Sequence, residues 1–412
     1  MSNSYMKRDE IMKLLIVSAD PRLTLGYSKV IHQIANYLAT KEVEIVMYTI
    51  NYEENDSLPN TYIDPRIKLM PIPDSTSFGL DKFTGVVDDE SPDCVLVYAP
   101  IPIVYNYISL LSDNMKIFVY ADICQKWADV HKLQNMKNKV THWFTFLKCW
   151  SDYLIDDMKI DSQKVSIIEH GINFNEFQPI ETIEAKKMAG FGKFVVLNLN
   201  RNTLRKNWAV TISGFVEFLS RHDYDPEIQL YVACGADKNS SDSHCDIESH
   251  VYTEFLKRGL NYMDYTSSFI LNNNPLGLTK EKLNLIYSAS DVGLNTCLSE
   301  GFGLCSIEHA YFNKPQVVTD LPVFRDTLKE SAIFMKPCCI TSYTGSSELN
   351  GDRAILDYNT VADALDICYK NHTKPVRRRV FDTREMVFNR FNWLNIHKQI
   401  DHVIDIVKDG SL

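Results

Sequence analysis

One segment near residue 300 restricts the possible folds of this chain more than any other. The apolar run Val292–Leu294 is typical of a buried strand, and the apolar segment 304–312 has helical spacing. Between them lies the sequence Asn-Thr-Cys-Leu-Ser-Glu-Gly-Phe-Gly of residues 295–303. The order of strand, glycine-containing loop and helix predicts a row of free backbone N–H groups, which is a favourable place for a phosphate.

The same alternation of strand and helix runs along the rest of the chain. Strands are predicted at 13–18, 44–49, 94–98, 116–120, 165–168, 194–199, 228–233 and 267–271. Such alternation indicates an α/β fold with parallel sheets covered on both faces, in which ligands bind at the carboxyl ends of the strands. A chain of 412 residues is long enough for two domains, each with its own core.

Two carboxylates flank the glycine loop, Glu300 before Gly301 and Glu308 within the following helix. Carboxylates accept hydrogen bonds from vicinal hydroxyls of a ribose or a sugar ring, whereas the backbone N–H groups suit a phosphate. A nucleotide sugar contains both groups. Two glutamates eight positions apart are more often a solvated helix face, and the loop between them is what favours a binding site here.

The pattern Glu-x7-Glu spanning Gly-Phe-Gly resembles the signature of the family-4 retaining glycosyltransferases. The resemblance implies the GT-B fold, in which two facing Rossmann-like domains with parallel sheets bind a nucleotide-sugar donor in the cleft between them. It also implies that Glu300 orients the donor sugar and that Glu308 contacts the ribose. The implied donor contacts in this segment are Glu300, Gly301, Phe302, Gly303, Leu304 and Glu308. The resemblance is strong over the second domain and weak over the first.

Two further donor contacts are predicted earlier in the second domain. Arg201 and Lys206 follow the strand predicted at 194–199, where two cations can hold a phosphate. They resemble the pair that holds the leaving diphosphate in this family, although a basic turn capping a strand would have the same sequence. By resemblance, the backbone at Ile270 and Leu271 would pair with the edge of the nucleobase, which leaves the identity of the base open.

The first domain offers two candidates, Gly26 and Asp122. The loop after the first predicted strand lacks GxGxxG, but in the resembled family its backbone approaches the diphosphate, so Gly26 is a donor-binding candidate. A glycine that only starts the helix is an equally good interpretation. Asp122 follows the strand at 116–120, where relatives commonly place a His; it is either a catalytic contact or a helix cap.

The motif His170-Gly171-Ile172-Asn173 resembles the one that closes the first domain in this family. We therefore predict a first domain, on the acceptor side, over residues 1–180. The helix at 391–412 returns to complete it. The second domain, on the donor side, covers residues 181–390.

The reaction implied by the resemblance is transfer of a hexose, with retention, from a nucleotide sugar to a glycan or another hydroxyl acceptor. GDP-mannose is the expected donor because many relatives are mannosyltransferases, and the acceptor, the linkage and the oligomeric state stay open. A nucleotide-sugar epimerase, a catalytically silent glycan- or nucleotide-binding protein and a phosphorylase are the alternatives. We expect no cofactor and no metal, because Asp223-Tyr224-Asp225 lies in a polar turn and His244, Cys245 and His250 match no common zinc spacing.

Composition limits the partners and the compartment. The formal net charge of −10 argues against nucleic acid, and ten cysteines without a CxxC motif predict reduced thiols in the cytoplasm. The apolar run Leu14–Val17 is too short for a signal peptide, and Pro100 and Pro102 interrupt the longest apolar stretch. The basic and aromatic segment 132–150 allows peripheral membrane contact, but burial of its aromatic residues is favoured.

Overall fold

The computed structural model describes residues 11–23, 26–52, 62–73, 78–234, 245–272, 278–345, 349–372 and 383–408. The chain divides into two compact units. Unit 1 comprises Met1–Ile123, Asp129–Gly171 and Trp393–Leu412, and unit 2 comprises Cys124–Ala128 and Ile172–Asn392. The chain thus leaves unit 1 after Gly171 and not near residue 180, and it returns at Trp393. The sequence placed residues 124–128 in the first domain, but their contacts assign them to unit 2.

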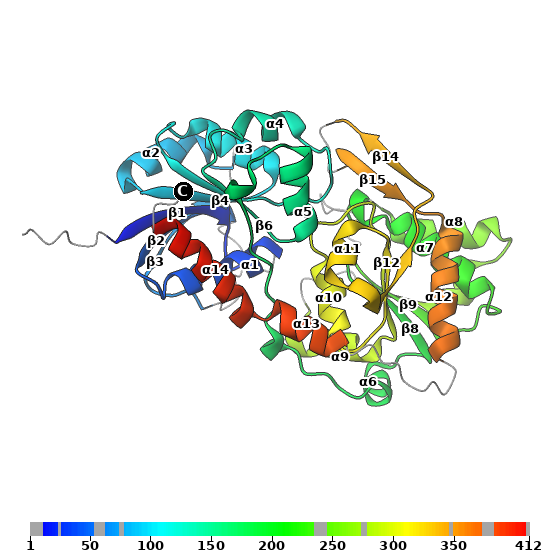
Figure 1. The fold of residues 1–412 in the computed structure, drawn as a ribbon. Helices are drawn as coiled ribbons and strands as arrows, with labels where there is room; N and C mark the ends of the chain where they lie inside the picture. Colours follow the sequence, from blue (N-terminus) through cyan, green and yellow to red (C-terminus); the bar gives the residue numbers. More distant parts are fainter. Residues whose placement is uncertain are drawn as a thin grey trace, which may run out of the picture. The chain divides into compact units, whose positions relative to one another are not determined.

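Unit 1 is built on a seven-stranded sheet in which every pair of neighbouring strands is parallel (Figure 1). The strands lie in the order β3 (Ile67–Pro73), β2 (Val43–Tyr52), β1 (Met12–Ala19), β4 (Cys94–Tyr98), β5 (Lys116–Tyr120), β6 (His142–Thr145) and β7 (Val165–Ile167). The helices are α1 (Gly26–Leu38), α2 (Leu80–Glu90), α3 (Ile101–Leu110), α4 (Val130–Met136), α5 (Lys148–Asp152) and α14 (Trp393–Lys408). The central strands are buried on both faces, which explains their continuous apolar sequences.

The aromatic segment 132–150 forms α4, β6 and the start of α5, and its large side chains lie in the core. Trp143 and Phe146 are fully buried, and Phe144 and Trp150 are 5% exposed. The prediction of burial is confirmed, and these aromatic residues are not available to a membrane surface. Among the described residues, no helix has the length and apolar character needed to cross a membrane.

Helix α14 packs on α1 within unit 1, although more than 350 residues separate them in sequence. Tyr37 donates a hydrogen bond of 2.6 Å to Asp401, and the Tyr37 ring stacks on His397 at 3.7 Å between centroids. The start of α14 lies against Gly171, where a Cβ would come within 2.4 Å of the Trp393 indole. These contacts fix α14 as a part of unit 1.

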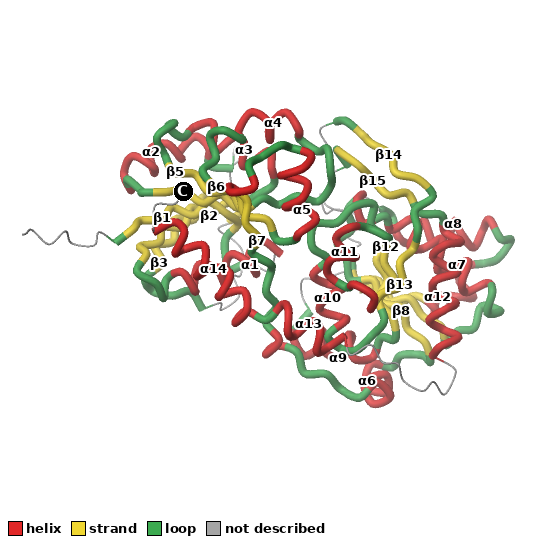
Figure 2. The backbone as a smooth tube through the Cα atoms, viewed as in Figure 1, coloured by secondary structure: helices red, strands yellow, loops and turns green. Residues whose placement is uncertain are grey.

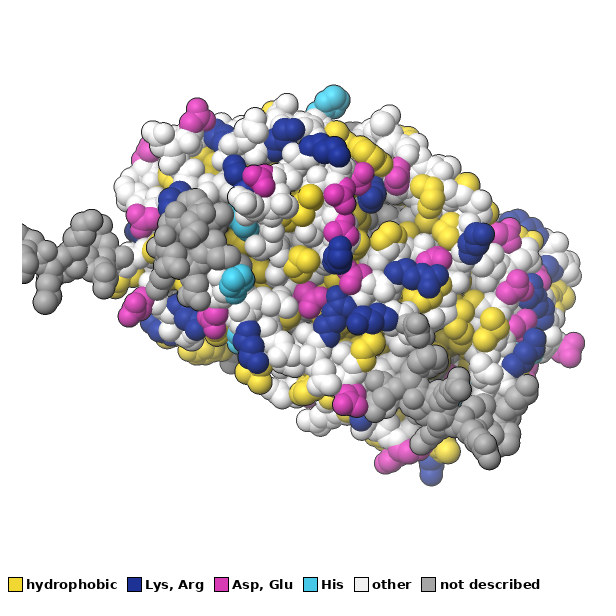
Figure 3. Space-filling model, viewed as in Figure 1, with side chains coloured by type: hydrophobic (Ala, Val, Ile, Leu, Met, Phe, Trp, Pro, Cys, Tyr) yellow, Lys and Arg dark blue, Asp and Glu magenta, His cyan; other side chains and the backbone are white. Residues whose placement is uncertain are grey.

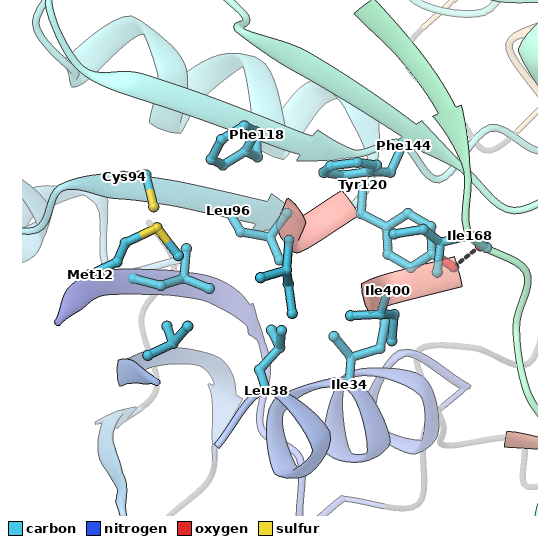
Figure 4. A pocket seen from close by; sticks show the side chains of 13 residues that line it. Met12, Ile34, Leu38, Cys94, Leu96, Phe118, Tyr120, Phe144, Ile168 and Ile400 are labelled. Atoms are coloured by element: carbon cyan, nitrogen blue, oxygen red, sulfur yellow. Dashed lines mark hydrogen bonds between the residues drawn. The ribbon is translucent and has the colours of Figure 1, made fainter. Parts of the chain in front are cut away.

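An apolar cavity lies between α1, α14 and the sheet of unit 1 (Figure 4). Tyr120 contributes its ring to the lining, and its hydroxyl is satisfied by a 2.6 Å hydrogen bond to the carbonyl of Ile168. The lining side chains are those of Met12, Leu14, Ile34, Leu38, Val43, Cys94, Leu96, Phe118, Tyr120, Phe144, Ile168, Ile400 and Ile404. The cavity therefore presents hydrocarbon and the sulfur atoms of Met12 and Cys94, with no charged group.

Unit 2 contains a second sheet, of six parallel strands, enclosed by helices (Figure 2). The strands lie in the order β10 (Phe269–Asn272), β9 (Ile228–Ala233), β8 (Phe194–Asn198), β11 (Val292–Asn295), β12 (Gln316–Thr319) and β13 (Ala332–Met335). The helices are α6 (Thr182–Ala189), α7 (Trp208–Ser220), α8 (Ile247–Lys257), α9 (Lys280–Ala289), α10 (Leu304–Ala310), α11 (Pro322–Thr327), α12 (Tyr358–His372) and α13 (Thr383–Phe391).

Alternate residues of each strand face opposite sides of this sheet, as the period of two requires. Phe194 and Val196 of β8 join one core cluster with α7, α8 and α12. Val195 and Leu197 join another cluster with Tyr287 of α9. Both faces of the sheet are therefore covered, and the predicted α/β class with two parallel sheets is confirmed.

An antiparallel hairpin, β14 (Cys339–Tyr343) and β15 (Gly351–Ile355), extends from unit 2. The side chains of β14 are all exposed, so the strand carries no pattern of burial that a sequence could reveal. On the face shown in Figure 3, Lys and Arg side chains alternate with Asp and Glu, without the large basic patch that binds nucleic acid.

Candidate functional site

The loop of residues 296–303, called the Glu300 loop below, follows the carboxyl end of β11 and leads into α10. Its Leu298 N–H donates a 2.8 Å hydrogen bond to the carbonyl of Arg205. Gly303, the residue before α10, has φ of 84°, and a Cβ there would lie 2.6 Å from the Phe324 ring. Only glycine fits this position without strain, so the sequence fixes the backbone path at which the loop becomes a helix.

Glu300 is the centre of a buried charge cluster. It is 7% exposed, and its carboxylate accepts hydrogen bonds from the ammonium of Lys206 and from the Arg205 guanidinium at 3.2 Å. The N–H of Gly301 donates to the same carboxylate at 3.0 Å. Burial by itself raises the pKa of Glu300, but the charges of Lys206 and Arg205 outweigh it and lower the pKa to about 2. Glu300 is therefore a carboxylate at neutral pH, and it can only accept hydrogen bonds.

Arg205 is a member of this cluster that the sequence analysis did not single out. Its guanidinium also donates to the Ser299 carbonyl at 2.7 Å, so it holds the backbone of the Glu300 loop as well as the carboxylate. The signal was present, because Arg205 is the neighbour of Lys206 in the same basic run. The predicted pair was Arg201 and Lys206, chosen for resemblance, and resemblance carried no information on Arg205.

Arg201 lies apart from the buried cluster. Its side chain is exposed, and within the described part of the chain no ion pair to it is found. Its carbonyl accepts a 3.1 Å hydrogen bond from the Trp208 indole, which anchors the backbone of the turn. The three cations of this turn and the single carboxylate of Glu300 leave two positive charges (three minus one). An anion is the ligand that this excess favours.

Glu308 lies on the opposite end of the Glu300 loop, in α10, and is buried. Its carboxylate accepts a 2.8 Å hydrogen bond from the Tyr287 hydroxyl of α9. Burial raises the pKa of Tyr287 well above its ordinary value, and the neighbouring Glu308 raises it further, so the phenol stays a hydrogen-bond donor. Tyr287 was also missed by the sequence analysis, because a buried Tyr in an apolar helix has the sequence signature of a core residue.

The remaining residues of unit 2 that were predicted to contact the donor are Phe302, Leu304, Ile270 and Leu271, and their predicted contacts are made mainly by the backbone. Phe302 is 4% exposed and packs edge to face on Phe391 at 5.5 Å, so its side chain is part of the core. Leu304 is the first residue of α10. Ile270 and Leu271 lie on β10, which pairs with β9 and is an edge strand in the described part of the sheet.

Asp122 of unit 1 accepts a hydrogen bond from the Tyr27 hydroxyl of α1. It follows β5 and bridges to Pro100, whereas α4 begins at Val130 after Asp129. The alternative that Asp122 caps a helix is therefore wrong. Gly26 is the exposed first residue of α1, a place that suits both interpretations of this glycine. Unit 1 thus places Asp122 and the start of α1 together through Tyr27.

The acidic and histidine-containing segments weighed as metal sites have other partners. Asp225 accepts hydrogen bonds from Lys193 and from the N–H of Glu227, and the first of these lowers its pKa. His250 approaches Ser213 at 3.2 Å, and His244 lies outside the described residues. Within the described ranges, no three His, Cys, Asp or Glu side chains gather in a way that could hold a metal.

Two proteins of known name are similar to this chain in sequence. The O-antigen chain mannosyltransferase RfbU of Salmonella typhimurium is 23% identical over 295 residues, which cover 71% of this chain and 70% of that protein. The mannosylfructose-phosphate synthase of Agrobacterium fabrum is 27% identical over 206 residues, which cover 47% of this chain and 43% of that enzyme. No protein-family model matches the sequence.

The fold is shared with solved structures over almost the whole chain. Sucrose-phosphate synthase from Thermosynechococcus elongatus superposes with a TM-score of 0.71 at 16% identity, covering 97% of this chain and all of that one. The Anabaena protein HepE in complex with UDP gives 0.64 at 11% identity, covering 96% of this chain and 99% of that one. Likeness at this level of identity establishes the architecture of the two units.

Proposed function

We propose that this chain, which has the GT-B fold and whose relatives are glycosyltransferases, transfers a hexose from a nucleotide sugar to a hydroxyl acceptor. The predicted resemblance is confirmed by the named relatives and by the shared fold. The observation that carries the proposal is the buried Glu300, held between Arg205 and Lys206 at the carboxyl end of a parallel strand. Ligands of open α/β sheets bind at this end.

The cluster has a role for each of its groups in such a transfer. Glu300 is ionised and can accept hydrogen bonds from the donor sugar, and Glu308 can accept them from the ribose. Arg201, Lys206 and the N–H groups near Gly303 would stabilise negative charge on the diphosphate. Arg205, which the sequence did not single out, adds a third cation. Preorganised charges of this kind are usually the largest contribution to catalysis.

We propose front-face transfer with retention. The acceptor oxygen bonds to the anomeric carbon on the side from which the diphosphate leaves, the bond from that carbon to the phosphate oxygen breaks, and the acceptor proton moves to the departing phosphate. Glu300 is engaged by two cations and orients the sugar; it does not act as the nucleophile of a hydrolase pair. The test is incubation of the protein with GDP-mannose and methyl glycosides, with NMR of the product. An α-linked product supports retention, and a sugar epimer formed without acceptor supports the epimerase instead.

The donor is the finer part of the proposal. GDP-mannose is favoured because the RfbU relative is named a mannosyltransferase and the second relative a mannosylfructose-phosphate synthase. HepE in complex with UDP shows that the same fold also accommodates uridine. We expect GDP to bind at least tenfold more tightly than UDP, or by about 1.4 kcal/mol, in calorimetric titrations of the same protein. Tighter binding of UDP would reject GDP-mannose and leave the transferase intact.

Metal independence is a further prediction. Arg205 and Lys206 surround the one carboxylate of Glu300, and the nearby turn adds Arg201. The positive charge that Glu300 does not compensate can neutralise the leaving diphosphate, so we expect that no divalent ion is needed for this. We expect the transfer rate in excess EDTA to stay within twofold of the rate in Mn²⁺ or Mg²⁺. Activity that is lost in EDTA and restored by Mn²⁺ would contradict this prediction and direct attention to Asp223 and Asp225.

A further inference from the structure

Residues 124–128 form a short wall beside the Glu300 loop in unit 2. The N–H of Asp352 in β15 donates a 2.9 Å hydrogen bond to the carbonyl of Lys126. Gly351 has φ of 104°, and a Cβ there would lie 2.5 Å from that same carbonyl. The Gln125 amide donates to the carbonyl of Asn350. The backbone of the hairpin therefore holds this segment by hydrogen bonds, and Gly351 leaves no room for a side chain at the point of contact.

The same segment is tied directly to the Glu300 loop. The hydroxyl of Ser299, the residue before Glu300, donates a 2.5 Å hydrogen bond to the side-chain oxygen of Gln125. Both residues are buried, at 4% and 9% exposure. On the other side, the N–H of Ala354 in β15 donates to the carbonyl of Leu298 at 2.7 Å. The wall, the hairpin and the Glu300 loop thus form one hydrogen-bonded assembly within unit 2.

Trp127 is the exposed aromatic residue of this wall. It is 46% exposed, whereas Trp143, Trp150 and Trp208 are at most 5% exposed. Its φ is 63° and that of Asp129 is 50°, a left-handed conformation that is costly for a bulky residue. The surrounding hydrogen bonds hold the backbone in this conformation. An indole kept at the surface by strained backbone, two residues from the partner of Ser299, is placed for contact with a ligand.

We propose that Trp127 is a platform for the sugar ring of the acceptor, and that it determines which acceptors are used. This inference rests on the proposed function. A hexose presents an apolar face of C–H groups and a rim of hydroxyls, and an exposed indole offers an apolar face of similar size with one N–H donor. The bond from Ser299 to Gln125 couples the position of this platform to the loop that carries Glu300, the group proposed to orient the donor sugar.

Binding can be measured without knowing the natural acceptor, because Trp127 is the most exposed tryptophan. Methyl α-mannoside, methyl α-glucoside and methyl α-galactoside are titrated, with and without GDP, while iodide quenching of tryptophan emission is followed. We expect at least one methyl glycoside to protect the emission from iodide. Trp127→Phe should remove this protection and reduce the quenching to the share of Trp393, which is of intermediate exposure. If none of the three protects Trp127 under either condition, the platform is rejected.

Kinetics separate the platform from a structural role. Trp127→Ala is expected to raise the KM for the glycoside acceptor at least tenfold, with GDP affinity and donor hydrolysis by water within twofold of the wild type. Trp127→Phe should keep the acceptor KM within threefold. Tyr252→Ala, which removes a 52% exposed ring from α8, is the matched control and should change none of these values.

The outcomes keep the two proposals apart. Equal losses of donor hydrolysis, GDP affinity and acceptor use in Trp127→Ala would show a structural or donor-side role and reject the acceptor platform. In another outcome, the wild type binds GDP and hydrolyses the donor, while Trp127→Ala leaves the KM for the acceptor unchanged. This result would reject the platform and leave the proposed function standing. A protein that binds neither GDP nor UDP rejects the proposed function, and the quenching experiment still decides whether Trp127 binds a sugar.

Discussion

Glu308→Ala is expected to lower kcat/KM at least 100-fold and to weaken nucleotide binding at least tenfold, while the protein stays folded. The carboxylate is buried and accepts a hydrogen bond from Tyr287, and we propose that it also accepts one from a ribose hydroxyl. A hydrogen bond to a charged group contributes about 1.5–3 kcal/mol, which corresponds to a factor of roughly 10 to 150. The measurements are transfer kinetics and calorimetric titration with GDP.

Two variants serve as comparisons for Glu308→Ala. Arg201→Ala is expected to abolish transfer and weaken nucleotide binding in the same way, while the fold is kept, because the side chain is exposed and is proposed to contact the ligand. Tyr287→Phe removes only the hydroxyl that positions Glu308, so we expect a smaller effect, about tenfold on kcat/KM. If Glu308→Ala and Arg201→Ala both keep full activity, or if either unfolds, the assignment of the site is wrong.

Glu300→Gln is expected to lower the free energy of unfolding by about 3–5 kcal/mol and to abolish transfer. The substitution removes the charge that compensates Arg205 and Lys206 and leaves two cations in a site only 7% exposed. Addition of Lys206→Met to this variant should recover at least 1 kcal/mol relative to the sum of the two single effects, because the residues are in contact. Activity should stay lost, since both groups are proposed to act on the donor.

The control for this prediction is another buried ion pair of unit 2. Asp291 accepts hydrogen bonds from Lys186 at 2.5 Å and from the Val195 N–H at 2.7 Å, close to the amino ends of β8 and β11. Asp291→Asn should therefore destabilise the protein without reducing kcat/KM per folded molecule. Equal loss of activity in the two variants would mean that Glu300 matters only for folding.

The pH dependence of this stability effect has a definite sign. The pKa of Glu300 is lowered from its ordinary value of 4.5 to about 2, so the folded protein binds its proton less tightly than the unfolded chain. The contribution of Glu300 is complete above about pH 4.5 and is lost as the pH falls toward 2. The difference in unfolding free energy between wild type and Glu300→Gln should thus be constant from pH 8 to pH 5 in denaturant titrations.

The sequence predicts the central strands well and the periphery poorly. Strands β4, β5 and β9 begin and end where their apolar runs do, because each is buried between two layers of helices. Strand β3 was missed, since Lys68, Pro71 and Pro73 interrupt its apolar residues. Strands β12 and β13 are four residues long, and β14 has no buried side chain, so neither length nor alternation distinguishes them from loops.

The candidate site shows the same limit at the scale of single residues. Glu300, Lys206 and Gly303 could be proposed because their types and spacing have a chemical meaning on their own. Arg205 and Gln125 acquire their roles only through contacts with residues 95 and 174 positions away in sequence. Such contacts depend on the tertiary structure, and the spacing of residue types in a single sequence does not show which distant residues meet.

Helix α14 sets the order in which this protein can be completed during translation. The first 171 residues include all seven strands of unit 1, yet α14 packs on α1 and begins only at Trp393. While the ribosome makes the 221 residues from Ile172 to Asn392, one face of α1 and the side chains around the apolar cavity have no cover. The nascent unit 1 is therefore expected to expose apolar surface until α14 has emerged, whereas unit 2 can close as soon as its own residues have emerged.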